Sequence, residues 1–339
     1  MSIEMRYFGY HFWQTRIRLV IMSVLAILYF SQLAEIGADI LSLDSMVTAG
    51  AILALYIPIL EFRMFNTRRN LDTWFSLPID RWKMALVHVL NGALHIAVVL
   101  AIGMIFEGMH VSTNAPSYNI FQLFVYYITI LALTLLAYGF FCFVFTQGNS
   151  TTDGTLFIFD YLLLPGVFNG IFLNRFYDSS PRYFYGIFTT IGSVSRKFEA
   201  TFWKQPYHYD SIWNLGYDLG GDPYYFAVNL LLNVLICAAA TMLMFRMFSC
   251  KHTEKVEDVS DSWFGYRTLI PVMAVLTISS VSSLAGYMFR LLFIYVAYVI
   301  YRKGVHLKRS DAYVIFGYAV LLLLFSCLAP GEFSLFGIY

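Results

Sequence analysis

Long, mostly apolar runs limit what this chain can fold into. A bilayer core is about 30 Å thick, so a crossing helix needs about 20 mostly apolar residues. The clear runs are Leu19–Ala38, Met46–Leu60, Ala85–Phe106, Ile120–Phe145, Leu156–Leu173, Tyr224–Phe245 and Ala312–Ala329. The sequence therefore predicts an all-α fold, a polytopic integral membrane helix bundle.

The stretch from Thr268 to Tyr301 is too long for one crossing. It contains the small residues Ser279–Ser283, with Gly286 shortly after them. Such residues favour a tight turn between two shorter helices, which gives nine crossings. A single long or broken helix is the alternative, so about eight or nine membrane-spanning helices are expected.

The composition excludes a soluble domain. Of the 339 residues, 59% are hydrophobic and 13% are charged, whereas soluble domains carry about 25% charged residues. The formal net charge of +1 also argues against a nucleic-acid partner, because phosphate binding needs a clustered basic excess. The expected surroundings are a lipid bilayer, with no nucleic acid.

Basic residues predict the orientation in the membrane. Arg6, Arg16 and Arg18 precede the first run, which places the N-terminus in the cytoplasm by the positive-inside rule. Alternation then puts the basic loops 66–83 and 302–311 on the same side. The external segment 177–223 also carries basic residues, but long loops obey the rule weakly.

The N-terminal segment 3–13 has apolar residues at near-helical spacing, namely Ile3, Tyr7, Phe8 and Phe12. This pattern predicts an interfacial helix on the inner leaflet. The alternative is that the first span simply starts early.

A short amphipathic stripe lies in the loop between the second and third runs. Leu71, Trp74 and Phe75 recur at i, i+3 and i+4, and Pro78 then ends the helix. A short cytoplasmic helix with a large aromatic stripe is typical of an element that docks into a groove on a soluble partner. The alternative is that Trp74 and Phe75 anchor the segment in the headgroup region.

The arrangement of basic residues, short helix and the run SLPIDRWK, leading directly into a span, resembles the permease subunits of bacterial ABC-2-type (type V) transporters, especially those of antibiotic-peptide-resistance exporters. The resemblance implies an N-terminal interfacial helix at 3–13 and a coupling helix at about 70–77 that lies in a cleft of an ATP-binding subunit. It also implies an external segment at 177–223 before the sixth span. On this layout, 1–248 is a six-span permease core and 249–339 is a membrane extension with two to three further spans.

The resemblance further implies the partners and the coupling residues. The chain is expected in the bacterial cytoplasmic membrane, with an ABC ATP-binding subunit and with a second copy or a homologous permease. The residues expected to couple to the ATPase are Arg68, Arg69, Leu71, Asp72, Trp74, Phe75, Pro78 and Arg81.

The sequence contains no nucleotide-binding motif of the form G-x-x-x-x-G-K-[ST]. ATP and Mg²⁺ are therefore expected on the partner subunit, with no cofactor on this chain. The chain alone is not expected to be an enzyme, although the assembled complex would be an ATP-hydrolysing translocase.

Ionisable side chains inside apolar runs are costly and deserve a functional reading. His88 and His95 lie seven residues apart on the third run, hence on one face, and Asp160 lies at a depth comparable with His88. We expect these to make intramembrane polar contacts, including a His88–Asp160 pair. A metal site is disfavoured, because no third ligand occurs at a recognisable spacing.

The fifth run is interrupted by Pro165-Gly166 and Asn169-Gly170. In transporters such breaks mark moving or substrate-facing helices, and a kink that only improves packing is the alternative. The external segment is rich in aromatic residues, which suit either an interface anchor or a cavity for an amphipathic substrate. The candidate substrate path is Pro165, Asn169, Trp203 and Tyr207.

The expected function is the membrane half of an ATP-driven exporter that works by alternating access. The alternative is a self-sufficient secondary transporter, which would need an internal repeat and mid-membrane carboxylates. An intramembrane enzyme is disfavoured, because neither H-E-x-x-H nor G-x-S-x-G is present.

Overall fold

A computed structural model gives the fold, and every regular element in its described residues is helical. The described residues are 3–36, 44–68, 74–114, 120–168, 186–203, 223–251, 256–260, 262–276, 284–302, 304–305 and 308–328. The chain divides into two compact units, one of residues 1–146 with 185–256 and one of residues 147–184 with 257–339.

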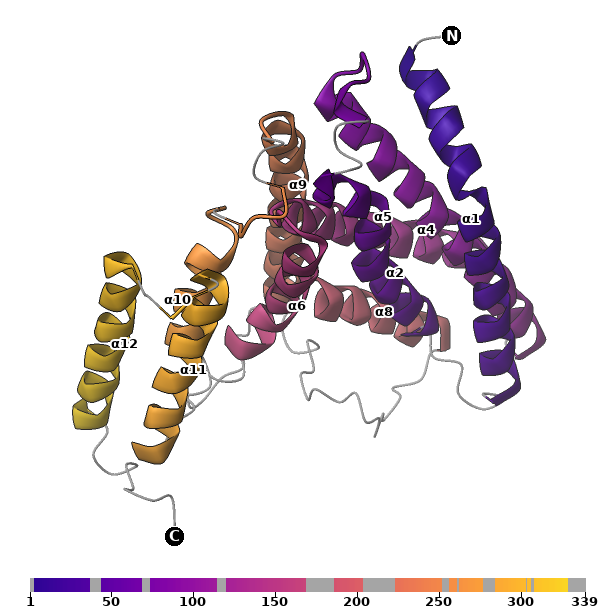
Figure 1. The fold of residues 1–339 in the computed structure, drawn as a ribbon. Helices are drawn as coiled ribbons and strands as arrows, with labels where there is room; N and C mark the ends of the chain where they lie inside the picture. Colours follow the sequence, from indigo (N-terminus) through magenta and orange to yellow (C-terminus); the bar gives the residue numbers. More distant parts are fainter. Residues whose placement is uncertain are drawn as a thin grey trace. The chain divides into compact units, whose positions relative to one another are not determined.

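The first unit is a helix bundle (Figure 1). Its elements are α1 (Ile3–Ile36), α2 (Asp44–Phe62), the short 3₁₀ helix η1 (Arg63–Asn66), α4 (Arg81–Asn114), α5 (Ile120–Thr146), α8 (Ile187–Trp203) and α9 (Pro223–Ser249). Helix α5 lies at the centre and contacts α2, α4, α8 and α9, while α1 packs along α4. Side chains are buried on several faces of α5, as expected for a helix that is hydrophobic all round.

Helix α1 differs from the prediction for the N-terminus. No separate interfacial helix ends at Trp13, because one helix runs without a break from Ile3 to Ile36. No proline occurs in this range, and the only glycine, Gly9, lies within the predicted interfacial segment. Among its described side chains, α1 buries Tyr7 and His11 four residues apart, and Ala26 and Phe30 four apart further along. The predicted segment 3–13 is thus the first part of a longer helix, and its position at the membrane interface stays a prediction.

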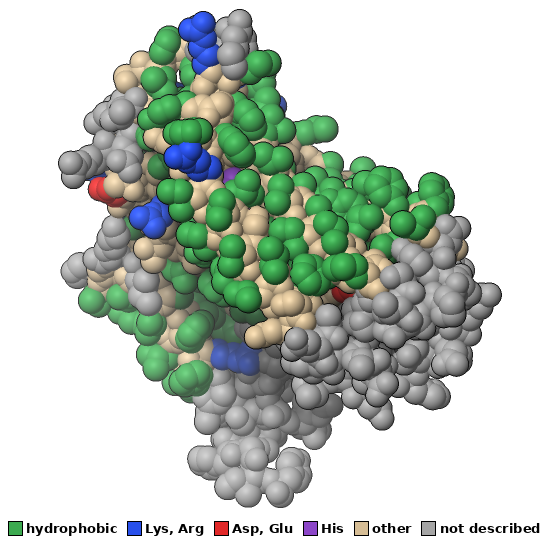
Figure 2. All heavy atoms as spheres, turned by 90° about the vertical axis from the view of Figure 1, so that its right-hand side faces the viewer, with side chains coloured by type: hydrophobic (Ala, Val, Ile, Leu, Met, Phe, Trp, Pro, Cys, Tyr) green, Lys and Arg blue, Asp and Glu red, His purple; other side chains and the backbone are tan. Residues whose placement is uncertain are grey.

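Among the described residues, five helices are long and apolar enough to cross a membrane by length and composition. They cover Glu4–Gln32, Ser45–Asn66, Arg81–Met109, Ile120–Thr146 and Phe226–Ser249. Their outer faces remain apolar: on α1, Ile17 is 65% exposed and Val20 is 60% exposed. Figure 2, seen from the side of α1, shows hydrophobic side chains over much of its described surface. A lipid environment accommodates such a surface, and water does not.

These five helices match the predicted spans at 19–38, 46–60, 85–106, 120–145 and 224–245. The predicted total of eight or nine is not confirmed. Within the predicted seventh and eighth spans the structure has two helices, α10 (Tyr266–Leu276) and α11 (Leu284–Arg302). Helix α10 has 11 residues, about 16 Å at 1.5 Å per residue, which is too short to cross alone.

The second unit contains α6 (Thr151–Val167), α10, α11 and α12 (Arg309–Leu328). Ser150 caps α6 by accepting a hydrogen bond of 3.1 Å from the backbone amide of Asp153. Arg302, at the end of α11, donates two hydrogen bonds of 2.8 and 2.9 Å to Asp311, at the start of α12. This bidentate pair fixes the connection between the two helices.

Glycine allows the helices of the first unit to approach one another closely. A Cβ atom at Gly92 on α4 would collide with the Tyr138 hydroxyl of α5 and lie 2.8 Å from Cγ2 of Ile57 on α2. A Cβ atom at Gly103 would lie 2.6 Å from the Phe30 ring of α1. Small residues at helix contacts are typical of membrane bundles, because they let backbones pack tightly.

We predict that Gly92→Ala lowers the free energy of unfolding by about 1–3 kcal/mol, because the added methyl group overpacks the contact of α4 with α5. Gly9→Ala is the control, since a Cβ atom at Gly9 meets nothing within 4 Å. That variant should be neutral or more stable by about 0.5–1 kcal/mol. Thermal unfolding in detergent measures both, and equal midpoints would contradict the described helix contact.

Candidate functional site

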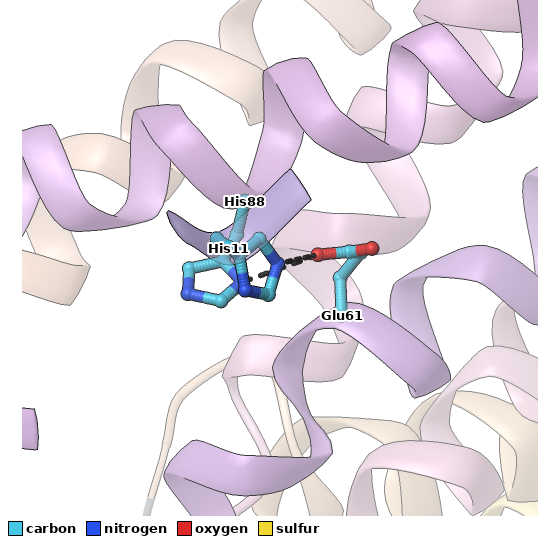
Figure 3. Close-up of side chains that lie close together, drawn as sticks. All are labelled: His11, Glu61 and His88. Atoms are coloured by element: carbon cyan, nitrogen blue, oxygen red, sulfur yellow. Dashed lines mark hydrogen bonds and ion pairs between the residues drawn. The ribbon is translucent and has the colours of Figure 1, made fainter. Parts of the chain in front are cut away.

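The side chain of Glu61, near the end of α2, is completely buried and is the centre of a polar cluster. One of its oxygens, Oε2, lies 2.8 Å from Nε2 of His11 on α1 and 3.1 Å from Nδ1 of His88 on α4. Figure 3 shows both imidazole rings directed toward this carboxylate. A single oxygen atom thus joins three helices.

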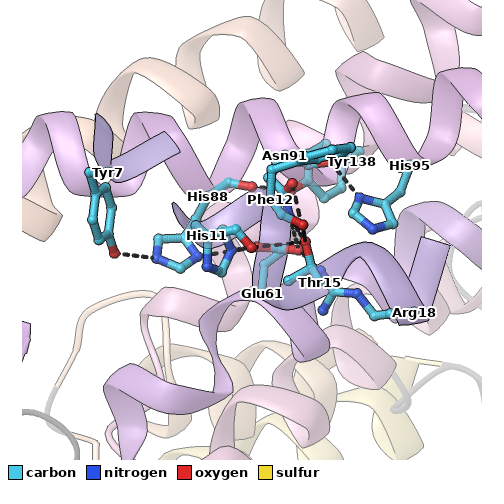
Figure 4. Close-up of polar contacts among 10 residues, drawn as sticks. All are labelled: Tyr7, His11, Phe12, Thr15, Arg18, Glu61, His88, Asn91, His95 and Tyr138. Atoms are coloured by element: carbon cyan, nitrogen blue, oxygen red, sulfur yellow. Dashed lines mark hydrogen bonds and ion pairs between the residues drawn. The ribbon is translucent and has the colours of Figure 1, made fainter. Parts of the chain in front are cut away.

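The other oxygen of Glu61, Oε1, is also occupied. The Arg18 guanidinium donates to it, and the Asn91 side-chain amide donates to it at 2.9 Å (Figure 4). The Arg18 side chain is 22% exposed, whereas that of Glu61 is 0% exposed. Arg18 therefore balances the buried negative charge while remaining within reach of the surface.

His88 uses both of its ring nitrogens. Nδ1 faces Glu61, and Nε2 lies 3.0 Å from the Tyr7 hydroxyl. A neutral ring with its proton on Nδ1 satisfies both contacts, because it donates to the carboxylate and accepts from the hydroxyl. His95 follows on the same face and donates from Nδ1 to the Asn91 carbonyl at 2.6 Å.

Helical spacing brings these residues together. Four residues of α1 share one face: Tyr7, His11, Thr15 and Arg18. Three residues of α4 do the same: His88, Asn91 and His95. Thr15 and Asn91 contact each other across the two faces, since the amide nitrogen of Asn91 donates to the Thr15 hydroxyl at 3.2 Å. The packing of α1 along α4 therefore closes the cluster around Glu61.

An aromatic group lies beside the cluster and holds the segment between α2 and α4. The ring of Phe65 lies 4.9 Å from that of His88 and 5.2 Å from that of Phe248 on α9. Phe75, in the connecting segment, lies 6.2 Å from Phe65, and Trp74 meets Tyr7 edge-on at 5.9 Å. Both Trp74 and Phe75 are half-buried in these contacts.

Hydrogen bonds reinforce the same end of the unit. Arg81 stacks over the ring of Phe75 at 4.4 Å and donates to the Lys251 carbonyl at 2.6 Å. The Lys251 ammonium donates to the Asn66 side chain at 2.8 Å. Burial lowers the pKa of Lys251 to about 8. The ends of α2, α4 and α9 are thus fastened together.

The structure describes some of the predicted site residues and leaves others out. Arg68 and Pro78 are exposed, and Arg68 donates to the Val256 carbonyl at 2.8 Å. Pro165 is half-buried inside α6, and Asp160 is half-buried on the same helix. Outside the described residues lie Arg69, Leu71, Asp72, Asn169 and Tyr207, together with the side chain of Trp203.

Tyr7 and Glu61 occupy both ring nitrogens of His88. The expected His88–Asp160 pair stays a prediction, because the two residues belong to different units. Sequence analysis did not identify Glu61, His11 or Arg18. Glu61 follows immediately after the second apolar run, and Arg18 comes just before the first, so both resembled ordinary boundary charges. The spacing of Tyr7, His11 and Arg18 on one helical face was the available signal.

The cluster also contains a possible set of metal ligands. The donor atoms of His11, Glu61 and His88 all lie within 4.8 Å of one another, and all three residues are buried. Of these three residues, the sequence analysis singled out only His88; His11 comes from α1 and Glu61 from α2. Two imidazoles and one carboxylate are the protein ligands of many zinc sites.

We predict strong coupling between Glu61 and Arg18. Glu61→Gln or Arg18→Met alone should each lower the free energy of unfolding, by up to about 3–5 kcal/mol, because each leaves the other charge uncompensated. The double variant should cost less than the sum of the two. Unfolding in detergent tests this, with the half-exposed Lys83–Glu4 pair as a control worth about 0–1 kcal/mol. Additive losses would contradict the pairing.

We predict that Lys251 makes stability depend on pH between about 8 and 10.5. In this range the unfolded chain binds the proton more tightly than the folded chain does, so stability should rise with pH, by up to about 3 kcal/mol. Lys251→Met should remove this rise. The control variant Lys308→Met, at an exposed position, should retain it. Parallel curves for wild type and Lys251→Met in thermal unfolding would refute the burial of this ammonium group.

Comparisons of the chain with models of protein families, with curated proteins and with solved structures find no match.

Proposed function

We propose that this chain is the transmembrane permease subunit of an ATP-driven exporter. A separate nucleotide-binding subunit hydrolyses ATP with Mg²⁺, and this chain provides the substrate path by alternating access. The observation that carries the proposal is the segment between α2 and α4. Among its described residues, Trp74 and Phe75 contact the bundle, and the polar residues Arg68, Ser76 and Asp80 are exposed.

The anchored side links the segment to the buried cluster. Trp74 contacts Tyr7, whose hydroxyl bonds His88. Phe75 contacts Phe65, whose ring lies against that of His88. Because packed side chains transmit displacement, a movement of the segment would reach α1, α2 and α4 together. A partner that pulls on the segment could in this way change the opening of the bundle.

The outward side offers the contact for that partner. Arg68, Ser76, Pro78 and Asp80 are exposed. Trp74 and Phe75 are not proposed as the docking residues themselves, because part of the surface of both rings contacts other residues of this chain. They position the segment, and the exposed residues meet the ATP-binding subunit. A second permease copy completes the assembly that the family resemblance implies.

The buried cluster favours a second candidate, a self-sufficient secondary transporter. Ionisable residues inside membrane helices often mark proton or ion pathways. Glu61, His11 and His88 lie in three helices that are apolar enough to span. On this alternative, protonation of the cluster would drive transport, and no ATPase would be needed.

Affinity purification from the cells that encode the chain distinguishes the two. We expect an ATPase of the cassette class to co-purify with the wild type. Ser76→Arg together with Pro78→Arg should reduce its recovery about tenfold or more, because unmatched charges at an interface cost at least about 1.4 kcal/mol. Gln14→Arg, at an exposed position on α1, is the control and should retain the ATPase.

Two results would reject the exporter subunit. One is a wild-type chain that purifies without an ATPase after mild cross-linking and moves protons in vesicles without nucleotide. The other is an ATPase whose recovery is the same for the Ser76/Pro78 variant and for the Gln14 control. The first result would support the secondary transporter instead.

A further inference from the structure

The donor atoms around Glu61 converge as metal ligands do. Nε2 of His11 and Nδ1 of His88 approach the same carboxylate oxygen, at 2.8 and 3.1 Å (Figure 3). Ligands of a tetrahedral zinc ion, at about 2.0–2.1 Å from the metal, lie about 3.4 Å from one another. If the two histidine nitrogens moved a few tenths of an ångström further from Oε2 of Glu61, a metal ion would fit among the three atoms.

The surroundings provide the outer contacts that metal ligands need. The second nitrogen of His88 meets the Tyr7 hydroxyl at 3.0 Å, which orients the ring. Asn91 and Arg18 hold Oε1 of Glu61, so that Oε2 faces the two imidazoles. Nδ1 of His11 is buried and has no hydrogen-bond partner among the described residues. Hydrogen bonds thus orient His88 and Glu61, whereas one ring nitrogen of His11 is left without a partner among the described residues.

We propose that His11, Glu61 and His88 bind one divalent transition-metal ion. Zn²⁺ fits best, because two histidines and one glutamate form a set of protein ligands seen at zinc sites, with the fourth position open. The same ligands also suit Fe²⁺, which metal analysis separates from Zn²⁺. The ion would staple α1 to α2 and α4. This proposal does not depend on the exporter function.

Arg18 opposes the ion and so gives the proposal a distinctive consequence. With Arg18 in place, the metal adds charge to a cluster that its guanidinium has already neutralised. Arg18→Gln removes that positive charge and keeps an amide group that can donate to Glu61, so it should strengthen metal binding, because like charges in a buried site repel. A purely structural role for the cluster gives Arg18 no such effect.

The experiment uses the full chain with a histidine-free tag, purified in detergent, stripped with chelator and titrated with Zn²⁺. Elemental analysis after dialysis should find about one Zn²⁺ per chain. His11→Gln and His88→Gln should abolish binding. Tyr7→Phe should weaken it about 10-fold or more through the lost outer contact, and Arg18→Gln should tighten it. His95→Gln is the control, because His95 bonds the Asn91 carbonyl and lies outside the ligand set.

The proposal fails if the wild type retains no more Zn²⁺ than the His11→Gln/His88→Gln double variant. It also fails if His95→Gln loses the metal to the same extent as those variants. Should the histidine variants not fold, Co²⁺ absorption of the wild type decides. Ligand-field bands of tetrahedral cobalt that strengthen in Arg18→Gln at limiting Co²⁺ support the site, and their absence from the wild type overturns it.

Discussion

A carboxylate buried among apolar helices is the constraint on which the first unit depends. An isolated charge in such surroundings is expensive, so Glu61 must be paired and hydrogen-bonded wherever the chain folds. Its four partners come from two helices: His11 and Arg18 from α1, and His88 and Asn91 from α4. Satisfying one side chain therefore fixes how α1, α2 and α4 meet, and glycine on α4 provides the close approach.

The same cluster gives the connecting segment a physical route into the bundle. Trp74 and Phe75 contact Tyr7 and Phe65, and both of these touch His88. The described residues of the segment thus combine two anchored rings with exposed polar side chains at Arg68, Ser76 and Asp80. This arrangement suits a segment that transmits movement from a partner to the membrane helices better than it suits one whose aromatic rings insert into the partner. A partner ATPase would act at the Trp74 and Phe75 end of this route, and a metal ion would bind at the His88 end.

Part of the fold could be predicted from sequence. Apolar length alone identified the five spans, because the bilayer thickness sets that length. The continuity of α1 was left as an alternative, since the periodicity of a short apolar stretch does not reveal where a helix ends. Only part of the cluster was predicted: His88 and His95 were identified as intramembrane polar residues. Glu61 and His11 required knowledge of which helices touch, and spacing within one helix does not provide that.

The central claim is that Glu61 holds the first part of α1 against α2 and α4. Hydrogen–deuterium exchange on wild type and Glu61→Gln, in the same detergent, tests it most directly. The account predicts faster exchange for the amides of residues 3–18 in the variant, with amides in the middle of α5 unchanged, because local opening follows the lost contacts. Identical exchange of residues 3–18 in the two proteins would contradict it.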